Sequence, residues 1–275
     1  MRFGRINLHI DYTQAGVQKE DGYMPHLDSY LLDDPESGFR RKAVIICPGG
    51  GYTFTSEREG EPIAMQFLAA GIQAFVLWYS VEPAVFPMAL MELAESVKVV
   101  RDHAEEWNID PDKISVMGFS AGGHLAASLL CFWNGGFLAE SLHVSPEEIQ
   151  PNGGLLCYPV ITSGEMAHRG SFDALLRGLS PEYLELTSLE KQVGPGHPPV
   201  FLWHTWEDEL VPVENTLYYI KALREHGIPC EAHIFVHGAH GLALATRETG
   251  SEKTDPAAEA ASAWTALAVA WVNML

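Results

Sequence analysis

The chain alternates between short, almost continuously apolar runs and longer segments in which apolar residues recur every three or four positions. A short apolar run bounded by glycine, proline or polar residues is typical of a strand that is buried on both faces of a parallel sheet. The sequence therefore predicts strands at residues 44–47, 73–79, 113–117, 154–158, 199–204 and 232–236.

Helices are expected between these strands. In the clearest of them, one apolar set recurs at helical spacing: Leu90, Leu93, Val97, Val100, Ala104 and Trp107. This spacing lays an apolar stripe on the sheet and leaves the charged residues of the segment facing solvent, namely Glu92, Glu95, Arg101 and Glu105. Further helices are predicted at 61–69, 123–130, 213–226 and 257–271, with Gly71 and Gly227 ending the first and the third.

The start of the chain and one interruption complete the expected architecture. Residues 1–41 carry short alternating segments with turn signals at 21–22 and 37–38, which favours an antiparallel edge before the parallel sheet. From 161 to 197 the regularity breaks down, so this insertion is expected to be a lid or pocket wall, or equally a plain surface connection. With 47% hydrophobic content, residues 1–275 are expected to form a single α/β domain that has a mostly parallel sheet and helices on both faces.

A serine at a strand-to-helix junction is the first candidate for chemistry. The segment Gly118–Gly122, Gly-Phe-Ser-Ala-Gly, lies between the strand at 113–117 and the helix at 123–130. A serine on so tight a turn needs strained backbone angles, and the flanking glycines remove Cβ atoms that would collide with the strand and the helix. The turn pushes the Ser120 hydroxyl outward, as a nucleophile requires. The alternative is a small-residue turn that only lets the helix pack close to the sheet.

A glycine-rich loop supplies candidate donors for an oxyanion. The strand at 44–47 runs into Pro-Gly-Gly-Gly-Tyr at 48–52, where backbone N–H groups can approach a ligand with no side chains in the way. We expect the N–H groups of Gly50 and Gly51, with that of Ala121, to face the oxygen of a tetrahedral intermediate. A phosphate-binding loop is the alternative, but no Gly-Lys-Ser/Thr ending follows the glycines.

The last two predicted strands are followed by a candidate acid and a candidate base. Three adjacent carboxylates follow the first of these strands, with Asp208 as the expected acid and Glu207 and Glu209 as its competitors. The last strand leads into His240, which glycines flank, and His237 is the rival base. Serine, then acid, then histidine, each beyond the end of a strand, is the order of the α/β-hydrolases and not of chymotrypsin-like or subtilisin-like enzymes.

Several segments resemble the acetylesterase and xylan-esterase branch of the α/β-hydrolases. They lie along most of the chain, at residues 47–52, 56–64, 118–124 and 202–215. In that family the aspartate of an Asp-x-x-Val-Pro segment is the triad acid, which here is Asp208. The histidine of a Gly-x-His-Gly segment is the base, which here is His240. Pro48 departs from the wider pattern, in which many relatives have a histidine before the glycines, so no role of that histidine is carried over.

The resemblance implies an α/β-hydrolase fold and two-step acyl transfer. His240 would take the proton of Ser120 as the hydroxyl attacks an ester carbonyl, and Asp208 would stay ionised. The implied substrates are acetylated, xylose-containing oligosaccharides or other small acetate esters, and no cofactor is expected. A prolyl-oligopeptidase-like peptidase and a non-catalytic binding protein of the same fold are the alternatives.

Aromatic residues and histidines near these motifs suggest further roles. Tyr52 and Trp206 are expected to bind a sugar ring, whereas Trp203 and Trp133 fit ordinary core positions better. His124, on the helix after the nucleophile, is a candidate for packing beneath the site. The remaining histidines lack partners at metal-ligand spacing, so no metal is assigned.

Composition indicates which classes of molecule the protein is expected to bind. The chain has 17 basic and 36 acidic residues and a net charge of −19, which disfavours nucleic-acid and anionic-membrane partners and favours a neutral small molecule. The N-terminus lacks the pattern of a signal peptide, and no apolar run is long enough to span a membrane. Widely spaced cysteines suit reduced, buried thiols: Cys47, Cys131, Cys157 and Cys230. We therefore expect a cytoplasmic protein, and a homo-oligomer is possible.

Overall fold

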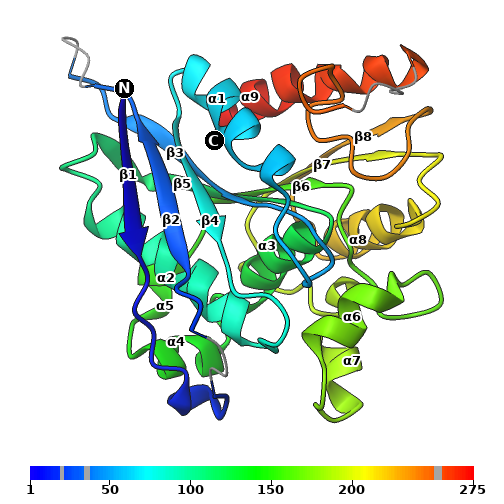
Figure 1. The fold of residues 1–275 in the computed structure, drawn as a ribbon, viewed down its shortest axis with the longest axis horizontal. Coiled ribbons are helices and arrows are strands. Elements are labelled where there is room, and N and C mark those ends of the chain that lie inside the picture. Colours follow the sequence, from blue (N-terminus) through cyan, green and yellow to red (C-terminus); the bar gives the residue numbers. More distant parts are fainter. Residues whose placement is uncertain (19–21, 34–37, 251–255) are drawn as a thin grey trace.

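One mostly parallel sheet runs through the centre of the molecule (Figure 1). The computed structural model describes residues 1–18, 22–33, 38–250 and 256–275, and within them the sheet has eight strands in the order β1-β2-β4-β3-β5-β6-β7-β8. The strands are β1 Arg2–Asn7, β2 His26–Leu31, β3 Arg41–Cys47, β4 Gln73–Trp78, β5 Ile109–Phe119, β6 Gly153–Cys157, β7 Val200–Thr205 and β8 Cys230–Phe235. Strand β2 runs antiparallel to both β1 and β4, and every other neighbouring pair is parallel. The antiparallel N-terminal edge is thereby confirmed.

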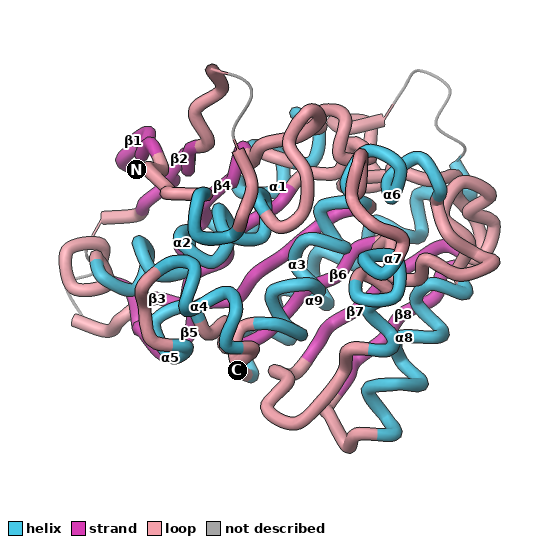
Figure 2. Tube along the Cα trace, turned by 90° about the horizontal axis from the view of Figure 1, so that it is seen from below, coloured by secondary structure: helices cyan, strands magenta, loops and turns pink. Residues whose placement is uncertain are grey.

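Helices cover both faces of the sheet (Figures 1 and 2). One face carries α1 Glu61–Ala69 and α9 Trp264–Met274, and the other carries α2 Met88–Asp102, α3 Ala121–Phe132 and α8 Glu214–Glu225. The shorter α-helices are α4 Gly136–Leu142, α5 Pro146–Ile149, α6 Arg169–Leu175 and α7 Glu182–Leu186. Short 3-10 helices are η1 Thr13–Ala15, η2 Glu57–Glu59, η3 Leu189–Lys191 and η4 Pro256–Ala263.

Burial on both faces explains the continuous apolar runs. In β3, Ile45 and Cys47 pack into the layer that contains α2 and α3, while Val44 and Ile46 pack into the layer that contains α1 and α9. Because successive side chains of a strand point to opposite faces, a sheet covered on both sides needs apolar residues at every position. The predicted strands all form, with ends that differ by a few residues.

Two helix predictions need correction. The helix that carries Leu90 ends at Asp102, and Ala104 and Trp107 are buried in the turns that follow it. The predicted helix at 257–271 is a 3-10 helix up to Ala263 and is α-helical only from Trp264. The first residues of the two predicted turns, Asp21 and Ser37, lie outside the described residues.

The solvent-facing position predicted for Glu92 is wrong. Its carboxylate is fully buried, accepts a hydrogen bond from the Tyr12 hydroxyl at 2.7 Å and accepts another from the Ser80 backbone N–H at 2.6 Å. Helical periodicity places Glu92 opposite the apolar stripe, but the N-terminal segment that carries Tyr12 packs over that side of α2. A residue 80 positions away in the chain therefore decides the environment of Glu92.

The insertion at 161–197 contains α6, α7 and η3, joined by irregular segments. It lies beyond the carboxyl end of β6, and Figure 1 shows α6 and α7 projecting below the sheet. No single helix within the described ranges is long and apolar enough to cross a bilayer. The neighbours α3 and α4 reach that length and hydropathy only together, across a bend of 99°.

The fit of α3 against the sheet gives a stability prediction. A Cβ atom on Gly122 would lie 2.1 Å from the Cys47 carbonyl oxygen, so we expect Gly122→Ala to lower the free energy of unfolding by about 3 kcal/mol. Urea denaturation measures the change. The control is Gly22→Ala, where no atom of the described residues lies within 4 Å of the new Cβ, and a change within about 0.5 kcal/mol is expected. Equal stability of the two variants would contradict the prediction.

Candidate active site

Ser120 occupies the turn between β5 and α3 with strained backbone angles, φ 54° and ψ −118°. Such angles are sparsely populated for a residue with a Cβ and cost on the order of 1–3 kcal/mol. A Cβ on Gly118 would lie 1.9 Å from the Gly122 carbonyl oxygen, and one on Gly122 would be as close to β3. The predicted need for glycine on both sides of the serine is confirmed, because only bare backbone lets strand and helix approach this closely.

The structure brings the three predicted triad side chains together. His240 Nε2 lies 2.7 Å from Ser120 Oγ, and His240 Nδ1 lies 2.6 Å from Asp208 Oδ2. Since an ionised carboxylate only accepts hydrogen bonds, Nδ1 carries the ring proton and Nε2 is free to accept the serine proton. The three residues follow β5, β7 and β8, whose carboxyl ends meet at one edge of the sheet.

The Asp208 carboxylate is buried and held by several donors. Its Oδ1 accepts hydrogen bonds from the backbone N–H groups of Leu210 and Val211, at 3.0 and 2.9 Å. Burial alone would raise the pKa of Asp208, but hydrogen bonds from His204, His240 and the Val211 N–H outweigh burial and hold the pKa below its usual value. Asp208 is therefore ionised at neutral pH.

His204 was not identified as a site residue from the sequence. It lies one residue before the end of β7 and is fully buried, with Nε2 3.2 Å from Asp208 Oδ2 and 2.9 Å from the Val211 carbonyl oxygen. Both neighbours of Nε2 are acceptors, so Nε2 carries the proton and Nδ1 accepts from the Thr216 hydroxyl at 2.8 Å. The available signal was a histidine four residues before the acid, at the end of the same buried strand.

The competing acids and base lie outside this arrangement. Glu207 Oε1 pairs with His237 Nδ1 at 2.9 Å, and about half of each side chain is exposed to solvent. Glu209 is also exposed. Glu207 and His237 therefore form a surface pair of their own, although they stand in the same loops as Asp208 and His240.

The glycine loop lies against Ser120. A Cβ on Gly49 would be 3.0 Å from Ser120 Cβ, and the Gly49 N–H donates to Glu59 Oε2 at 2.8 Å. Gly50 and Gly51 adopt φ values of 133° and 66°, which side chains other than glycine rarely permit. Among the described residues, no acceptor is paired with the N–H groups of Gly50, Gly51 or Ala121. These three donors are free to meet a ligand, as an oxyanion hole requires.

The aromatic platform expected at Tyr52 is absent. Tyr52 is only 3% exposed, and its hydroxyl pairs with His124 Nδ1 at 2.9 Å. The other ring nitrogen of His124 donates to the Thr187 carbonyl at 2.9 Å, and burial lowers the pKa of His124 to about 4, so the ring is neutral. Tyr52 and His124 thus support the glycine loop from beneath, and Tyr52 offers no flat face to a sugar.

The tryptophans differ in exposure. Trp203 is buried and stacks on Trp264, with ring centroids 5.3 Å apart, and Trp133 is half-buried. Trp206 is 62% exposed, so among the residues predicted to bind a sugar ring only Trp206 presents an aromatic surface to solvent.

A histidine of the 161–197 insertion reaches the site. The His168 ring lies 4.0 Å from where a Cβ on Gly51 would stand, and its Nδ1 pairs with Ser171 Oγ at 2.8 Å. Burial lowers the pKa of His168, and the nearby His240 lowers it further. The start of the insertion therefore borders the glycine loop, which sequence spacing did not indicate because His168 has no local partner at metal-ligand spacing.

The cysteines and possible metal ligands are dispersed. Cys47 and Cys157 are buried as expected, but Cys131 is only half-buried and Cys230 is exposed; all four thiols are free. Cys230 lies on β8, an edge strand that has β7 as its one neighbour in the sheet and whose side chains are partly exposed. Across the described parts of the chain, no three histidine, cysteine or acidic side chains are grouped as metal ligands.

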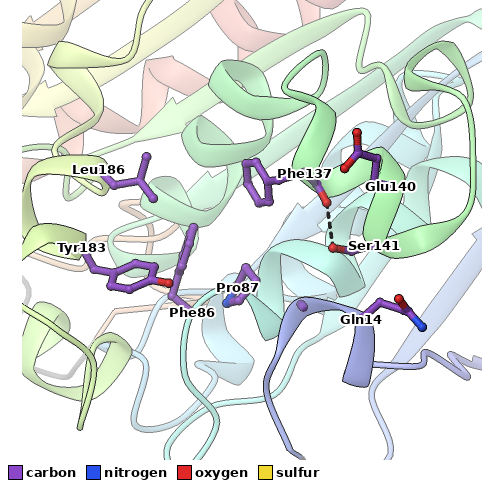
Figure 3. Close-up of a pocket in the computed structure, with 9 residues that line it drawn as sticks. Gln14, Phe86, Pro87, Phe137, Glu140, Ser141, Tyr183 and Leu186 are labelled. Atoms are coloured by element: carbon purple, nitrogen blue, oxygen red, sulfur yellow. Dashed lines mark hydrogen bonds between the residues drawn. The ribbon is translucent and has the colours of Figure 1, made fainter.

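A pocket of about 460 Å³ lies apart from Ser120, His240 and Asp208, between α4, α7 and the segment before α2 (Figure 3). Phe86, Phe137 and Tyr183 form its aromatic wall. Glu140 and Ser141 stand on the α4 side, where the Ser141 hydroxyl donates to the Phe137 carbonyl at 2.7 Å. None of the residues that line it belongs to the triad.

Sequence comparisons agree with the geometry. The chain matches the BD-FAE family over residues 27–142. It is 39% identical over 237 residues to endo-1,4-beta-xylanase B of Butyrivibrio fibrisolvens, and 32% identical over 225 residues to an acetylxylan esterase of Xylanibacter ruminicola. These matches cover 82% and 79% of this chain but only 36% and 43% of the relatives, so the chain spans less than half the length of either.

The fold comparison covers nearly all of both chains. The crystal structure of an acetyl ester-xyloside bifunctional hydrolase from Caldicellulosiruptor lactoaceticus matches with a TM-score of 0.83 and 36% sequence identity, over 98% of this chain and 96% of that one. With the strand order, the nucleophile turn and the order of serine, acid and histidine, these matches show that the chain belongs to the α/β-hydrolase esterases, in the branch that contains acetylxylan esterases and BD-FAE domains.

Proposed function

We propose that this protein is a serine carboxylic-ester hydrolase that removes acetyl groups from acetylated xylo-oligosaccharides or other small acetate esters. The observation that carries the proposal is the hydrogen-bonded chain from Ser120 through His240 to Asp208, next to the unpaired N–H groups of the glycine loop. A non-catalytic protein of this fold has no need to keep both features.

The first half of the reaction acetylates the serine. Ser120 Oγ attacks the ester carbonyl carbon while its proton moves to His240 Nε2, and Asp208 stabilises the resulting imidazolium without taking its proton. The tetrahedral intermediate then collapses, the bond to the alcohol oxygen breaks, and Nε2 returns the proton to the leaving alcohol. Acetyl-Ser120 remains.

The second half regenerates the enzyme. Water gives its proton to His240 Nε2 and attacks the acetyl carbonyl, and the intermediate releases acetate as Ser120 recovers its proton. In both halves the carbonyl oxygen becomes negative, and the N–H groups of Gly50, Gly51 and Ala121 are the proposed donors to it. Loss of one such donor typically raises the barrier by about 3 kcal/mol.

The substrate assignment rests on two relatives and on the shape of the site. Acetylated xylan and acetyl esters appear in the names of the Xylanibacter and Caldicellulosiruptor proteins. The insertion at 161–197, which brings His168 to the glycine loop, is the proposed wall of the acyl pocket. A wall this close to the oxyanion donors favours a short acyl group, and the exposed ring of Trp206 is the proposed contact for a sugar.

Replacement of the nucleophile tests the function itself. We expect Ser120→Ala to lower kcat for 4-nitrophenyl acetate by about 10⁴-fold or more, because no other group can form the acyl-enzyme. Activity confined to peptide amides would support a peptidase instead, and no turnover of any ester or amide by the unmodified protein would support a binding role.

The acid is tested against its two neighbours. We expect Asp208→Asn to lower kcat by about 10³- to 10⁴-fold, because the amide favours the wrong tautomer of His240. Glu207→Gln and Glu209→Gln are matched controls in the same loop and should change kcat by less than about threefold, as is usual for exposed positions. A large loss in either control with an active Asp208→Asn would reassign the acid.

Acyl-chain length tests the proposed pocket wall. We expect kcat/KM for 4-nitrophenyl esters to fall from acetate to butyrate and to fall by about 100-fold or more at octanoate, because extra methylenes must displace packed side chains. A preference for octanoate would contradict the small-acyl assignment.

A further inference from the structure

A buried carboxylate outside the triad lies behind the nucleophile. Glu59, the last residue of η2, is 4% exposed. Its Oε2 accepts the backbone N–H of Gly49 at 2.8 Å, and its Oε1 accepts the Tyr158 hydroxyl at 2.6 Å. The proton-transfer chain uses neither of these bonds, so Glu59 needs a separate explanation.

Tyr158 extends this contact to the loop that carries the base. Its hydroxyl oxygen accepts the backbone N–H of Ala243 at 2.9 Å while it donates to Glu59. Its ring meets the His240 imidazole edge to face, with centroids 5.1 Å apart and planes at 74°. Tyr158 therefore contacts the His240 loop through both its ring and its hydroxyl.

The neighbouring residue of η2 holds the same loop from another side. Arg58 Nη2 donates to the Gly241 carbonyl at 2.8 Å, and Arg58 Nε donates to the Thr249 carbonyl at 2.6 Å. One short turn thus supplies side chains to both ends of the segment after His240, and through Glu59 it also binds the glycine loop.

The loop after His240 needs such support. Ala243 and Ala245 have φ values of 51° and 53°, in the left-handed region that costs free energy for residues with a Cβ. Local backbone preference therefore opposes the observed path of the loop. The contacts from Tyr158 and Arg58 are among those that hold it in place.

We propose that Glu59 is a positioning residue that fixes the glycine loop relative to the His240 loop, through Gly49 on one side and Tyr158 on the other. The inference rests on the proposed esterase function and deepens it. When Ser120 attacks, the oxyanion forms at the glycine loop as the positive charge forms on His240. A rigid link between the two loops sets both partners at the distance that the transition state requires.

The charge state of Glu59 agrees with this role. Both of its oxygens accept hydrogen bonds, which is the pattern of an ionised carboxylate. Burial raises the pKa of Glu59 above its usual value, and the hydrogen bonds from Tyr158 and Gly49 and the nearby His240 offset part of this effect. The carboxylate is therefore held by the glycine loop directly and by the His240 loop through Tyr158.

Two substitutions test the link. Glu59→Gln keeps the shape of the side chain but places an amide NH₂ against one of its two donors, and Tyr158→Phe removes the bonds to Glu59 and Ala243. We expect each to lower kcat for 4-nitrophenyl acetate by about 10- to 100-fold with KM changed by less than about twofold, because the loss arises in the transition state. The kcat of the double variant should be little lower than that of the less active single variant, since both substitutions act through one link.

The chain offers a matched control. Glu92 is a buried carboxylate that also accepts from a tyrosine hydroxyl and a backbone N–H, but it lies on α2, and these donors belong to Tyr12 and Ser80, outside the glycine loop and the His240 loop. We expect Glu92→Gln to lower the unfolding temperature with kcat changed by less than about threefold. A folded Glu59→Gln protein whose kcat is within about threefold of the unmodified protein would overturn the inference. Equal losses of kcat in Glu59→Gln and Glu92→Gln, or multiplied losses in the double variant, would do the same.

A second variant and two parallel assays distinguish failure of this inference from failure of the proposed function. If Glu59→Gln does not fold, the kcat of Tyr158→Phe tests the inference, with the same limits on the expected loss. Its control is Tyr219→Phe, at a buried tyrosine whose hydroxyl bonds to His197. The unmodified protein and Ser120→Ala are assayed in parallel. An inactive unmodified protein overturns the proposed function and this inference together, whereas an active one with an unaffected Glu59→Gln variant overturns only the inference.

Discussion

The close approach of bare backbone around Ser120 is the constraint on which the rest of the site depends. The Gly122 position at the start of α3 leaves no room for a Cβ against the Cys47 carbonyl at the end of β3. This contact brings the strand that leads into the glycine loop and the helix that follows the nucleophile to the same point. The hydroxyl, the free N–H groups of the loop and the N–H of Ala121 then share one small volume, and Asp208 and His240 are added from the neighbouring strands.

Buried carboxylates connect segments that are distant in the chain. Asp208 binds backbone N–H groups of its own loop and His240, Glu59 binds Gly49 and Tyr158, and Glu92 binds Ser80 and a tyrosine near the N-terminus. Glu59 accepts from a tyrosine hydroxyl and a backbone N–H. Neutral donors of this kind bind a buried carboxylate without placing a second full charge beside it, which avoids part of the desolvation cost of an ion pair.

The sequence predicted the strands, and it singled out the three side chains that the structure brings together, because both depend on local patterns. Strands buried on both faces are continuous apolar runs, and Ser120, Asp208 and His240 stand in short motifs at strand ends. The errors and omissions have a common cause. The burial of Glu92 and the role of Tyr158 depend on partners at least 80 positions away, which no local period reveals.

Other site residues were missed for related reasons. His204 and Glu59 belonged to segments that carried the family resemblance, but their partners become clear only when β7, the glycine loop and the loop after β8 are placed side by side. The buried ring of Tyr52 was mistaken for a sugar platform because an aromatic residue beside a glycine loop has the same appearance in sequence whether it points outward or inward.

The wide separation of Ser120 and His240 along the chain also affects the order in which the site is made. Ser120 and His240 are 120 positions apart, and the base arrives on the loop after the edge strand β8. At translation rates of about 5–20 residues per second, the serine exists for roughly ten seconds before its histidine has been synthesised. During that interval the nascent chain lacks the imidazole that pairs with Ser120 Oγ, so the proposed activation of the hydroxyl has to wait for the loop after β8.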